Sequence, residues 1–290
     1  MRWTSYLHDG QRRHGRLTDD QQGVIDHGPG DLLGLLEGEG LAAAGSRREG
    51  ATYDLADVVL ASPVQRPPKL LAVAANYADH IREGGGTPMT ADRAIPRLFL
   101  KPTTAIIGPR DPLPLPTVSR AVDWEVELAV VIGRRCRNVA PADALDVVAG
   151  YMTANDVSAR SLDFPVERAE EHRAPFFEWL MGKWPDGFAP LGPWLVTADE
   201  VPDPQQLDLK LSVNGQVRQD GSTADMIFSV TELIAFASSF MTLEPGDVIE
   251  TGTPAGVGAA TQDFLNPGDV ITASVGDLGE QHTEVVAPTD

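Results

Sequence analysis

The chain has one cysteine and no long apolar run, and each shortage excludes a class of protein. Cys136 has no second cysteine to pair with. This excludes an internal disulfide, a metal site built on paired thiols and a redox-active pair of thiols. No apolar run approaches the roughly 18–20 residues of a membrane span. The N-terminus lacks the basic-then-apolar pattern of a signal peptide, and we therefore expect a cytoplasmic protein.

Basic residues are also scarce. The sequence holds 23 Lys and Arg against 42 Asp and Glu, which gives a formal net charge of −19 at pH 7. Such a charge repels nucleic acid and anionic membranes, so we expect neither as a partner. The composition favours an enzyme that acts on small molecules. With 290 residues, 42% of them hydrophobic, the chain can bury a substantial core.

Two common catalytic motifs are missing. The small-residue loop Thr251–Gly258 lacks the Gly-Lys-Ser/Thr ending of a P-loop. No G-x-S-x-G sequence occurs, which argues against a serine hydrolase of the nucleophile-elbow type. The loop follows a predicted strand at Val248–Glu250, and its amides and hydroxyls could bind a carboxylate.

The organisation of the chain predicts two units. Residues 1–65 form a small α+β unit with an Asp9-Gly10 turn and a short helix at Asp31–Leu36, and a proline-rich linker ends it. Residues 69–290 form the main domain, in which β-like runs dominate and Asn214-Gly215 marks a hairpin. The fold class is therefore α+β, rich in strands and without regular βαβ alternation. The predicted strands are Leu70–Ala74, Leu98–Leu100, Asp123–Ile132, Pro193–Val196 and Leu207–Val213, and the predicted helices are Pro141–Val148 and Val230–Phe240.

Acidic and apolar residues alternate from Asp123 onward. In a β-strand alternate side chains point the same way, so Asp123, Glu125 and Glu127 would share one face. The opposite face, from Trp124 to Ile132, is an apolar stripe, which places the acids at the rim of a site. Carboxylates two residues apart lie roughly 7 Å apart at Cα, and their repulsion is relieved by a cation or by protonation. A chelated cation is the functional interpretation, and a solvated acidic face is the alternative.

Asp156 adds a carboxylate just past a second probable strand, Val147–Met152. It could equally be a turn residue, as Asn-Asp pairs usually are. Oxygen ligands without histidine or cysteine select a hard ion, Mg²⁺ first, with Mn²⁺ or Ca²⁺ as further candidates. Three protein ligands would leave about three of six octahedral positions for water and substrate.

His80 and Glu83 are three residues apart and precede the triplet Gly84–Gly86. In a helix they would lie one turn apart, as a base with the acid that orients it. A surface pair is the alternative interpretation. The glycines weaken the helix end and supply a hinge for a lid. His172, in a Glu-Glu-His-Arg run, is expected to be solvated.

Lys183 lies in the loop Gly182–Pro190, among aromatic residues, glycines and prolines. Three carboxylates on a divalent ion leave a net charge of −1, and a nearby lysine would restore neutrality and bind an anionic substrate. An ordinary surface lysine is the alternative.

Together these segments resemble the fumarylacetoacetate hydrolase superfamily from about Lys69 to the C-terminus. The resemblance is specific because five separated segments occur in order. They are Asn76-Tyr77-Ala78-Asp79-His80 with Glu83, Asp123-Trp124-Glu125-Val126-Glu127-Leu128, Asn155-Asp156-Val157-Ser158-Ala159-Arg160, Gly182-Lys183 with Asp186, and Thr251-Gly252-Thr253-Pro254. One departure is Ala75, which stands where many relatives carry glycine.

The resemblance implies a mixed β-roll catalytic domain, usually dimeric, behind a smaller N-terminal domain. It implies a catalytic dyad on a mobile lid, a Mg²⁺ or Mn²⁺ site, and residues that contact the substrate. The implied roles are His80, Glu83 and Lys183 for catalysis, Glu125, Glu127 and Asp156 for the metal, and Tyr77, Lys183 and Thr253 for the substrate.

The expected function is metal-dependent hydrolysis of a C–C bond in a 2,4-dioxo acid, such as an acylpyruvate or a fumarylpyruvate-like substrate. The same motifs occur in tautomerases, isomerases and decarboxylases of 2-oxo acids, which remain the alternative. A non-catalytic ligand-binding protein on the same fold is a third hypothesis, and the presence of both His80 and Glu83 argues against it.

Overall fold

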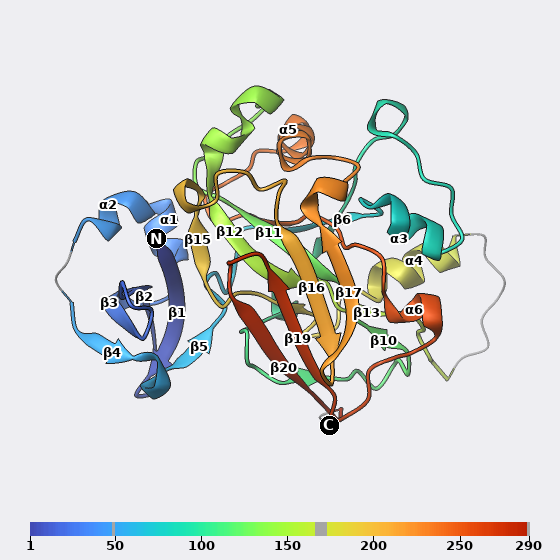
Figure 1. The fold of residues 1–290 in the computed structure, drawn as a ribbon, viewed down its shortest axis with the longest axis horizontal. Coiled ribbons are helices and arrows are strands. Elements are labelled where there is room, and N and C mark those ends of the chain that lie inside the picture. Colours follow the sequence, from blue (N-terminus) through green and yellow to red (C-terminus); the bar gives the residue numbers. More distant parts are fainter. Residues whose placement is uncertain (48–49, 166–172, 289–290) are drawn as a thin grey trace.

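The computed structural model describes residues 1–47, 50–165 and 173–288 (Figure 1). His172 lies outside these ranges, so its predicted solvation is not tested. Within them, none of the helices combines the length and apolarity that a membrane crossing requires.

The N-terminal residues form an antiparallel meander. The predicted Asp9-Gly10 turn is confirmed, with both residues at positive φ (51° and 73°) between the first two strands. The predicted helix begins later than Asp31 because the Asp31 carboxylate accepts a hydrogen bond from the Leu33 amide (3.1 Å) and caps the chain just before the helix. The elements are β1 (Arg2–His8), β2 (Gln11–Leu17), β3 (Gly23–Pro29), α1 (Leu33–Glu37), α2 (Leu41–Gly45), β4 (Thr52–Asp54) and β5 (Val59–Ala61).

This meander continues into the largest sheet of the protein. The strand order is β4-β3-β2-β1-β15-β12-β11-β18-β6-β7, and β5 pairs with β1. Figure 1 shows β15 between the N-terminal meander and the strands of the larger region. The further strands of this sheet are β6 (Leu70–Ala74), β7 (Arg97–Lys101), β11 (Val126–Ile132), β12 (Val148–Asn155), β15 (Leu195–Thr197) and β18 (Val248–Glu250).

A second sheet, with order β17-β16-β19-β20-β9, lies over β11 and β12 (Figure 1). The predicted Asn214-Gly215 turn joins its first hairpin, with φ of 52° and 77°. Two short pairs, β10 with β13 and β14 with β8, complete the strands of the described residues. Their bounds are β8 (Ile106–Ile107), β9 (Leu113–Pro114), β10 (Val122–Asp123), β13 (Ser158–Ala159), β14 (Ala189–Pro190), β16 (Asp208–Val213), β17 (Gln216–Ser222), β19 (Val270–Val275) and β20 (Glu280–Val286).

The helices lie around these sheets. The predicted helix α5 (Val230–Phe240) is confirmed and begins with a capping box between Ser229 and Glu232. The segment predicted as a helix from Pro141 is a 3-10 helix, Pro141–Val147. The remaining α-helices are α3 (Ala78–Glu83), α4 (Ala174–Met181) and α6 (Gly258–Thr261). The mixed α+β fold class is thus confirmed.

The strand predicted from Asp123 to Ile132 is divided into β10 and β11. The break follows Asp123, whose carboxylate accepts hydrogen bonds from the backbone amides of Trp124 (2.8 Å) and Gly258 (2.6 Å). Every residue of β11 is buried, on both faces of the sheet. The apolar stripe is therefore in the core as predicted, but the prediction that the acids lie at a rim is wrong, because the opposite face is enclosed as well.

Candidate active site

Three carboxylates meet where β11 and β12 lie side by side. Glu127 is on β11, Glu125 directly precedes that strand, and Asp156 directly follows β12. The antiparallel register pairs Glu127 with Ala154, and the Asp156 amide donates to the Glu125 carbonyl (2.9 Å). One carboxylate oxygen from each of the three residues lies within 4.8 Å of the others. The structure therefore brings together the three predicted metal ligands. All three are buried, with Glu125 5% exposed and Glu127 and Asp156 each 1% exposed.

Asp123 does not join this cluster. Its carboxylate accepts hydrogen bonds from the amides of Gly258 (2.6 Å) and Ala259 (2.9 Å) and from Arg160 Nε (2.8 Å). The strand breaks between Asp123 and Glu125, so the predicted strand alternation does not set their positions, although both carboxylates contact Arg160. Arg160 Nη2 also donates to Glu125 Oε1 (2.5 Å), so Asp123 holds the arginine that neutralises a carboxylate of the cluster.

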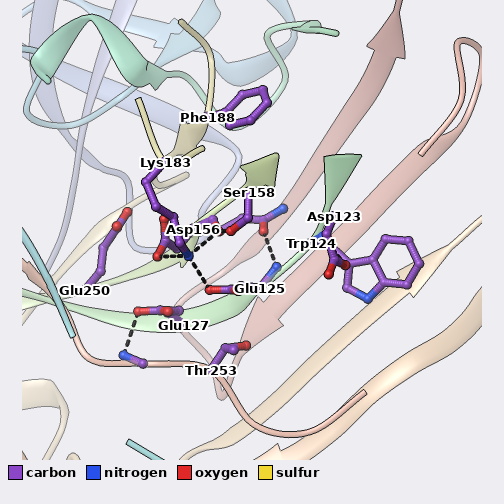
Figure 2. Close-up of polar contacts among 12 residues, drawn as sticks. Asp123, Trp124, Glu125, Glu127, Asp156, Ser158, Lys183, Phe188, Glu250 and Thr253 are labelled. Carbon is purple, nitrogen blue, oxygen red and sulfur yellow. Dashed lines mark hydrogen bonds and ion pairs between the residues drawn. The ribbon is translucent and has the colours of Figure 1, made fainter. Parts of the chain in front are cut away.

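Two buried lysines lie against the same carboxylates. Lys183 Nζ donates to Glu125 Oε2 (2.7 Å) and Asp156 Oδ2 (2.6 Å), and Figure 2 shows its ammonium between the two side chains. Lys101 Nζ pairs with Asp156 Oδ1 and donates to the Phe188 carbonyl (2.7 Å). The interpretation of Lys183 as an ordinary surface residue is wrong, since it is 2% exposed.

Glu250 is a further buried carboxylate, at the end of β18 (Figure 2). Neither of its oxygens forms a hydrogen bond within the described residues, and Lys101 Nζ lies 3.7 Å from Oε2. Burial raises the pKa of the Glu250 carboxyl to about 7, although the charge of Lys101 opposes this.

The pKa values of two carboxyls in the cluster shift in opposite directions. Burial and the charge of Asp156 raise the pKa of Glu127 well above its usual value. Burial also opposes ionisation of Glu125, but the charges of Lys183 and Arg160 outweigh it and hold the Glu125 pKa below its usual value. Burial alone would lower the pKa of Lys183, but its two carboxylate partners raise it, so the ammonium stays charged.

These residues fit a hard divalent cation. All of the donors are carboxylate oxygens, which suit Mg²⁺ and Mn²⁺. When all five buried carboxyls are ionised, they face three cations, so five minus three leaves two negative charges, which one divalent cation would balance. The carboxylates are those of Asp123, Glu125, Glu127, Asp156 and Glu250, and the cations are those of Lys101, Arg160 and Lys183.

The predicted dyad forms on α3. His80 Nδ1 lies 2.7 Å from Glu83 Oε1, and Glu83 Oε2 accepts a hydrogen bond from the Gly256 amide (2.8 Å). The two side chains are 21% and 16% exposed, so they form a partly buried pair held against the loop Thr251–Gly258. With Nδ1 bound to Glu83, His80 keeps Nε2 for other chemistry.

The dyad lines a cavity of about 640 Å³ that it shares with Arg160, the arginine bound to the Glu125 carboxylate. A second cavity, of about 720 Å³, is lined mainly by apolar and aromatic side chains, including Phe99, Trp179 and Trp184. Trp179 and Ala75 line both cavities. The cavity of the dyad therefore reaches the carboxylate cluster through Arg160, which binds Glu125.

Tyr77 and Thr253, the other predicted substrate contacts, are both buried. The Tyr77 hydroxyl has no hydrogen-bond partner within the described residues, and the charge of Glu127 helps burial to raise its pKa. The Thr253 hydroxyl donates to the Val126 carbonyl (2.8 Å) and accepts from Gln219 Nε2 (2.8 Å). Thr253 therefore joins the loop to β11, while Tyr77 offers a free donor.

Lys101, Arg160 and Glu250 had no predicted role. Lys101 and Glu250 each end an apolar strand, and Asp156 follows one. The strand-end argument that singled out Asp156 could therefore have found the other two as well. Arg160 lies inside one of the resembling segments, but nothing in its local sequence shows that it reaches Glu125.

Comparison with known proteins decides the family. Residues 69–286 match the model described as the fumarylacetoacetate (FAA) hydrolase C-terminal family. The chain belongs to the fumarylacetoacetate hydrolase family. Within it, a protein of Burkholderia ambifaria provisionally named a hydrolase is 42% identical over 284 residues, which cover 93% of this chain and 96% of the relative.

Solved structures of the family include both hydrolases and isomerases. Maleylpyruvate hydrolase from Sphingobium sp. SYK-6, in complex with manganese(II) and pyruvate, is 34% identical, with a TM-score of 0.79 and 100% of both chains covered. A 5-carboxymethyl-2-hydroxymuconate delta-isomerase from Mycobacterium smegmatis is also 34% identical, with a TM-score of 0.78 and coverage of 99% of this chain and 100% of the other.

Proposed function

We propose that this protein is a divalent-metal-dependent hydrolase that cleaves a C–C bond in a 2,4-dioxo acid. The observation that carries the proposal is the position of the His80–Glu83 dyad, which lines the same cavity as the arginine bound to the carboxylate cluster. Hydrolysis of a chelating 2-oxo acid needs a base near a cation site.

Glu125, Glu127 and Asp156 would hold the cation, Mg²⁺ or Mn²⁺. When bound there, the ion supplies positive charge that orients a 2-oxo acid and lowers the energy of a departing enolate. The manganese in the structure of the maleylpyruvate hydrolase relative supports this choice of metal.

His80 would act as the general base through Nε2. Glu83 would accept from Nδ1–H, which would fix the tautomer that leaves Nε2 free to take a proton. His80 would take a proton from a water that attacks the C4 carbonyl, and the C3–C4 bond would break with its electron pair left on C3. The same imidazolium would return the proton to C3, so that the products are pyruvate and a carboxylic acid.

Lys183 and Tyr77 would set the electrostatics of this step. The charged Lys183 ammonium neutralises two ligand carboxylates and so reduces repulsion of an anionic substrate. The Tyr77 hydroxyl, which lacks a partner within the described residues, would donate to a substrate oxygen. Thr253, whose hydroxyl joins its loop to β11, would also contact the substrate.

Proton transfer at C3 is the second candidate, because the same base could shuttle a proton without water attack. The isomerase among the solved relatives supports it, and decarboxylation of a 2-oxo acid would need only the cation. A non-catalytic binding protein would have no use for the partly buried contact between His80 and Glu83.

A turnover screen separates these functions. The protein would be freed of metal by chelation, then supplied with Mg²⁺ or Mn²⁺, and offered acetylpyruvate and oxaloacetate. We expect metal-dependent release of pyruvate and acetate from acetylpyruvate, faster than any turnover of oxaloacetate. Turnover of oxaloacetate alone would favour the second candidate, and turnover of neither, across larger acylpyruvates as well, would favour a binding protein.

We further propose a cytoplasmic homodimer that acts on a small anionic 2-oxo acid, with no nucleic-acid or membrane partner. The net charge of −19 supports the absence of such polyanionic partners. Light scattering of the purified protein would give its mass, and a mass of one chain would contradict the dimer.

A further inference from the structure

Arg97 lines the cavity of the dyad, and the proposed function gives it no role. It begins β7, is exposed, and lines both the dyad cavity and the apolar cavity. Its guanidinium forms no hydrogen bond or ion pair with any residue in the described ranges. In a chain with a net charge of −19, a guanidinium that has no acidic partner among the described residues is available for an anion from solution.

Arg97 lies on the same side of β7 as two residues next to the carboxylate cluster. Alternate side chains of a strand share one side, so Arg97, Phe99 and Lys101 point the same way. Lys101 reaches Asp156, and the Phe99 ring centroid lies 5.6 Å from Lys183 Nζ. Arg97 is thus the outer end of a row that starts at the cation site.

Distance and existing pairings limit what Arg97 can bind. Four residues of strand separate Arg97 from Lys101 by roughly 13 Å at Cα. The other arginine of the dyad cavity, Arg160, is already bound to Asp123 and Glu125. A 2-oxo acid whose head lies at the cluster would therefore present the far end of its chain to Arg97.

We propose that Arg97 binds a second, distal carboxylate of the substrate, so that the protein selects dicarboxylic over monocarboxylic 2-oxo acids. This rests on the proposed function for the position of the substrate head. A seven-carbon chain separates its terminal carboxyl carbons by roughly 7 Å, and the arginine side chain can cover the remaining distance. The planar guanidinium suits a carboxylate because it donates two parallel hydrogen bonds.

Calorimetric binding to the Mn²⁺-loaded protein tests this without turnover. The probes are 2-oxoheptanedioate and 2-oxoheptanoate, which differ only in the distal carboxylate. We expect wild-type protein to prefer the diacid by roughly 10- to 100-fold, the usual worth of a charge-assisted hydrogen bond pair. Arg97→Gln should reduce the preference to roughly threefold or less, and Arg97→Lys should retain part of it.

Arg93→Gln is the matched control, because it removes the same charge from the neighbouring 3-10 helix at a residue that lines neither cavity. It should keep the wild-type preference. Equal binding of the two acids by wild-type protein, equal weakening of both by Arg97→Gln, or an equal loss in Arg93→Gln would each overturn the proposal.

The two proposals fail separately in these experiments. Neither probe has a 4-oxo group, so neither can be cleaved as a 2,4-dioxo acid. Selective binding of the diacid by a protein that cleaves no acylpyruvate would contradict only the hydrolase proposal. Cleavage of acetylpyruvate by a protein with no preference between the probes would contradict only the role of Arg97.

Discussion

Replacing Lys101 with methionine should destabilise the protein in a way that a divalent cation partly reverses. The Lys101 side chain is fully buried and is paired with Asp156 and Glu250. Breaking a buried ion pair by removing one partner costs roughly 3–5 kcal/mol of unfolding free energy. Lys183 still contacts Asp156 at 2.6 Å, which places the expected loss near the lower end, about 3 kcal/mol.

The cation should restore stability because it supplies positive charge in place of the charge that the Lys101→Met substitution removes. At a concentration 100 times its dissociation constant, a ligand of the folded state adds about 2.7 kcal/mol. The extra negative charge of Lys101→Met should also tighten Mn²⁺ binding, so the gain in the variant should exceed that in wild-type protein. Urea unfolding with and without Mn²⁺ measures both quantities.

Lys69→Met is the control for this prediction. Lys69 pairs with the fully buried Asp247 at 2.6 Å, but that carboxylate is outside the metal cluster. Its loss should destabilise the protein and give no additional response to Mn²⁺. The reasoning would be refuted if Lys101→Met unfolded at the wild-type urea concentration, or if Mn²⁺ rescued both variants equally.

Three further predictions concern the ligands, the dyad and pH. Glu125→Ala and Glu127→Ala should each abolish activity and weaken Mn²⁺ binding in calorimetric titration, and unchanged affinity would mean that these acids are not ligands. His80→Ala should lower kcat by roughly 10²–10⁴-fold with Mn²⁺ affinity intact, and Glu83→Gln should lower it less; wild-type kcat in His80→Ala would end its assignment as the base. The Glu250 carboxyl has a pKa of about 7 in the folded protein and 4.5 as its reference, so the folded state binds its proton more tightly and metal-free stability should fall as pH rises from 4.5 through 7. Glu250→Gln should flatten this fall in urea unfolding measured across that range, and an unchanged slope would contradict the shift.

Local patterns in the sequence were sufficient for much of the site. The spacing of Glu125 and Glu127, the strand end before Asp156 and the helical spacing of His80 and Glu83 each depend on a few neighbouring residues. The structure places all five where a metal site and a dyad could form. The turns at Asp9-Gly10 and Asn214-Gly215 were predictable for the same reason.

The parts that failed depend on contacts between distant segments. The break after Asp123 is set by the amides of Gly258 and Ala259, 135 and 136 residues further along the chain. Burial of the acidic face requires the complete sheet. The proximity of Lys101 to Glu250 follows from the parallel pairing of β6 with β18 and the antiparallel pairing of β6 with β7. No short pattern encodes such register.

Ala75, which departs from the glycine expected by resemblance, has a backbone conformation that favours glycine. It has a φ of 58° and lines both cavities. The left-handed conformation costs a residue other than glycine roughly 1–2 kcal/mol, so glycine would fit this backbone position with less strain.

The origin of the oxygen in the product tests the hydrolase proposal most directly. Mg²⁺-loaded protein would be incubated with acetylpyruvate in ¹⁸O-water, and the products analysed by mass spectrometry. Attack of water at C4 predicts that the new oxygen enters acetate and that the rate falls in His80→Ala. Acetylpyruvate that is left uncleaved, while oxaloacetate loses CO₂ or exchanges between keto and enol forms, would contradict hydrolysis.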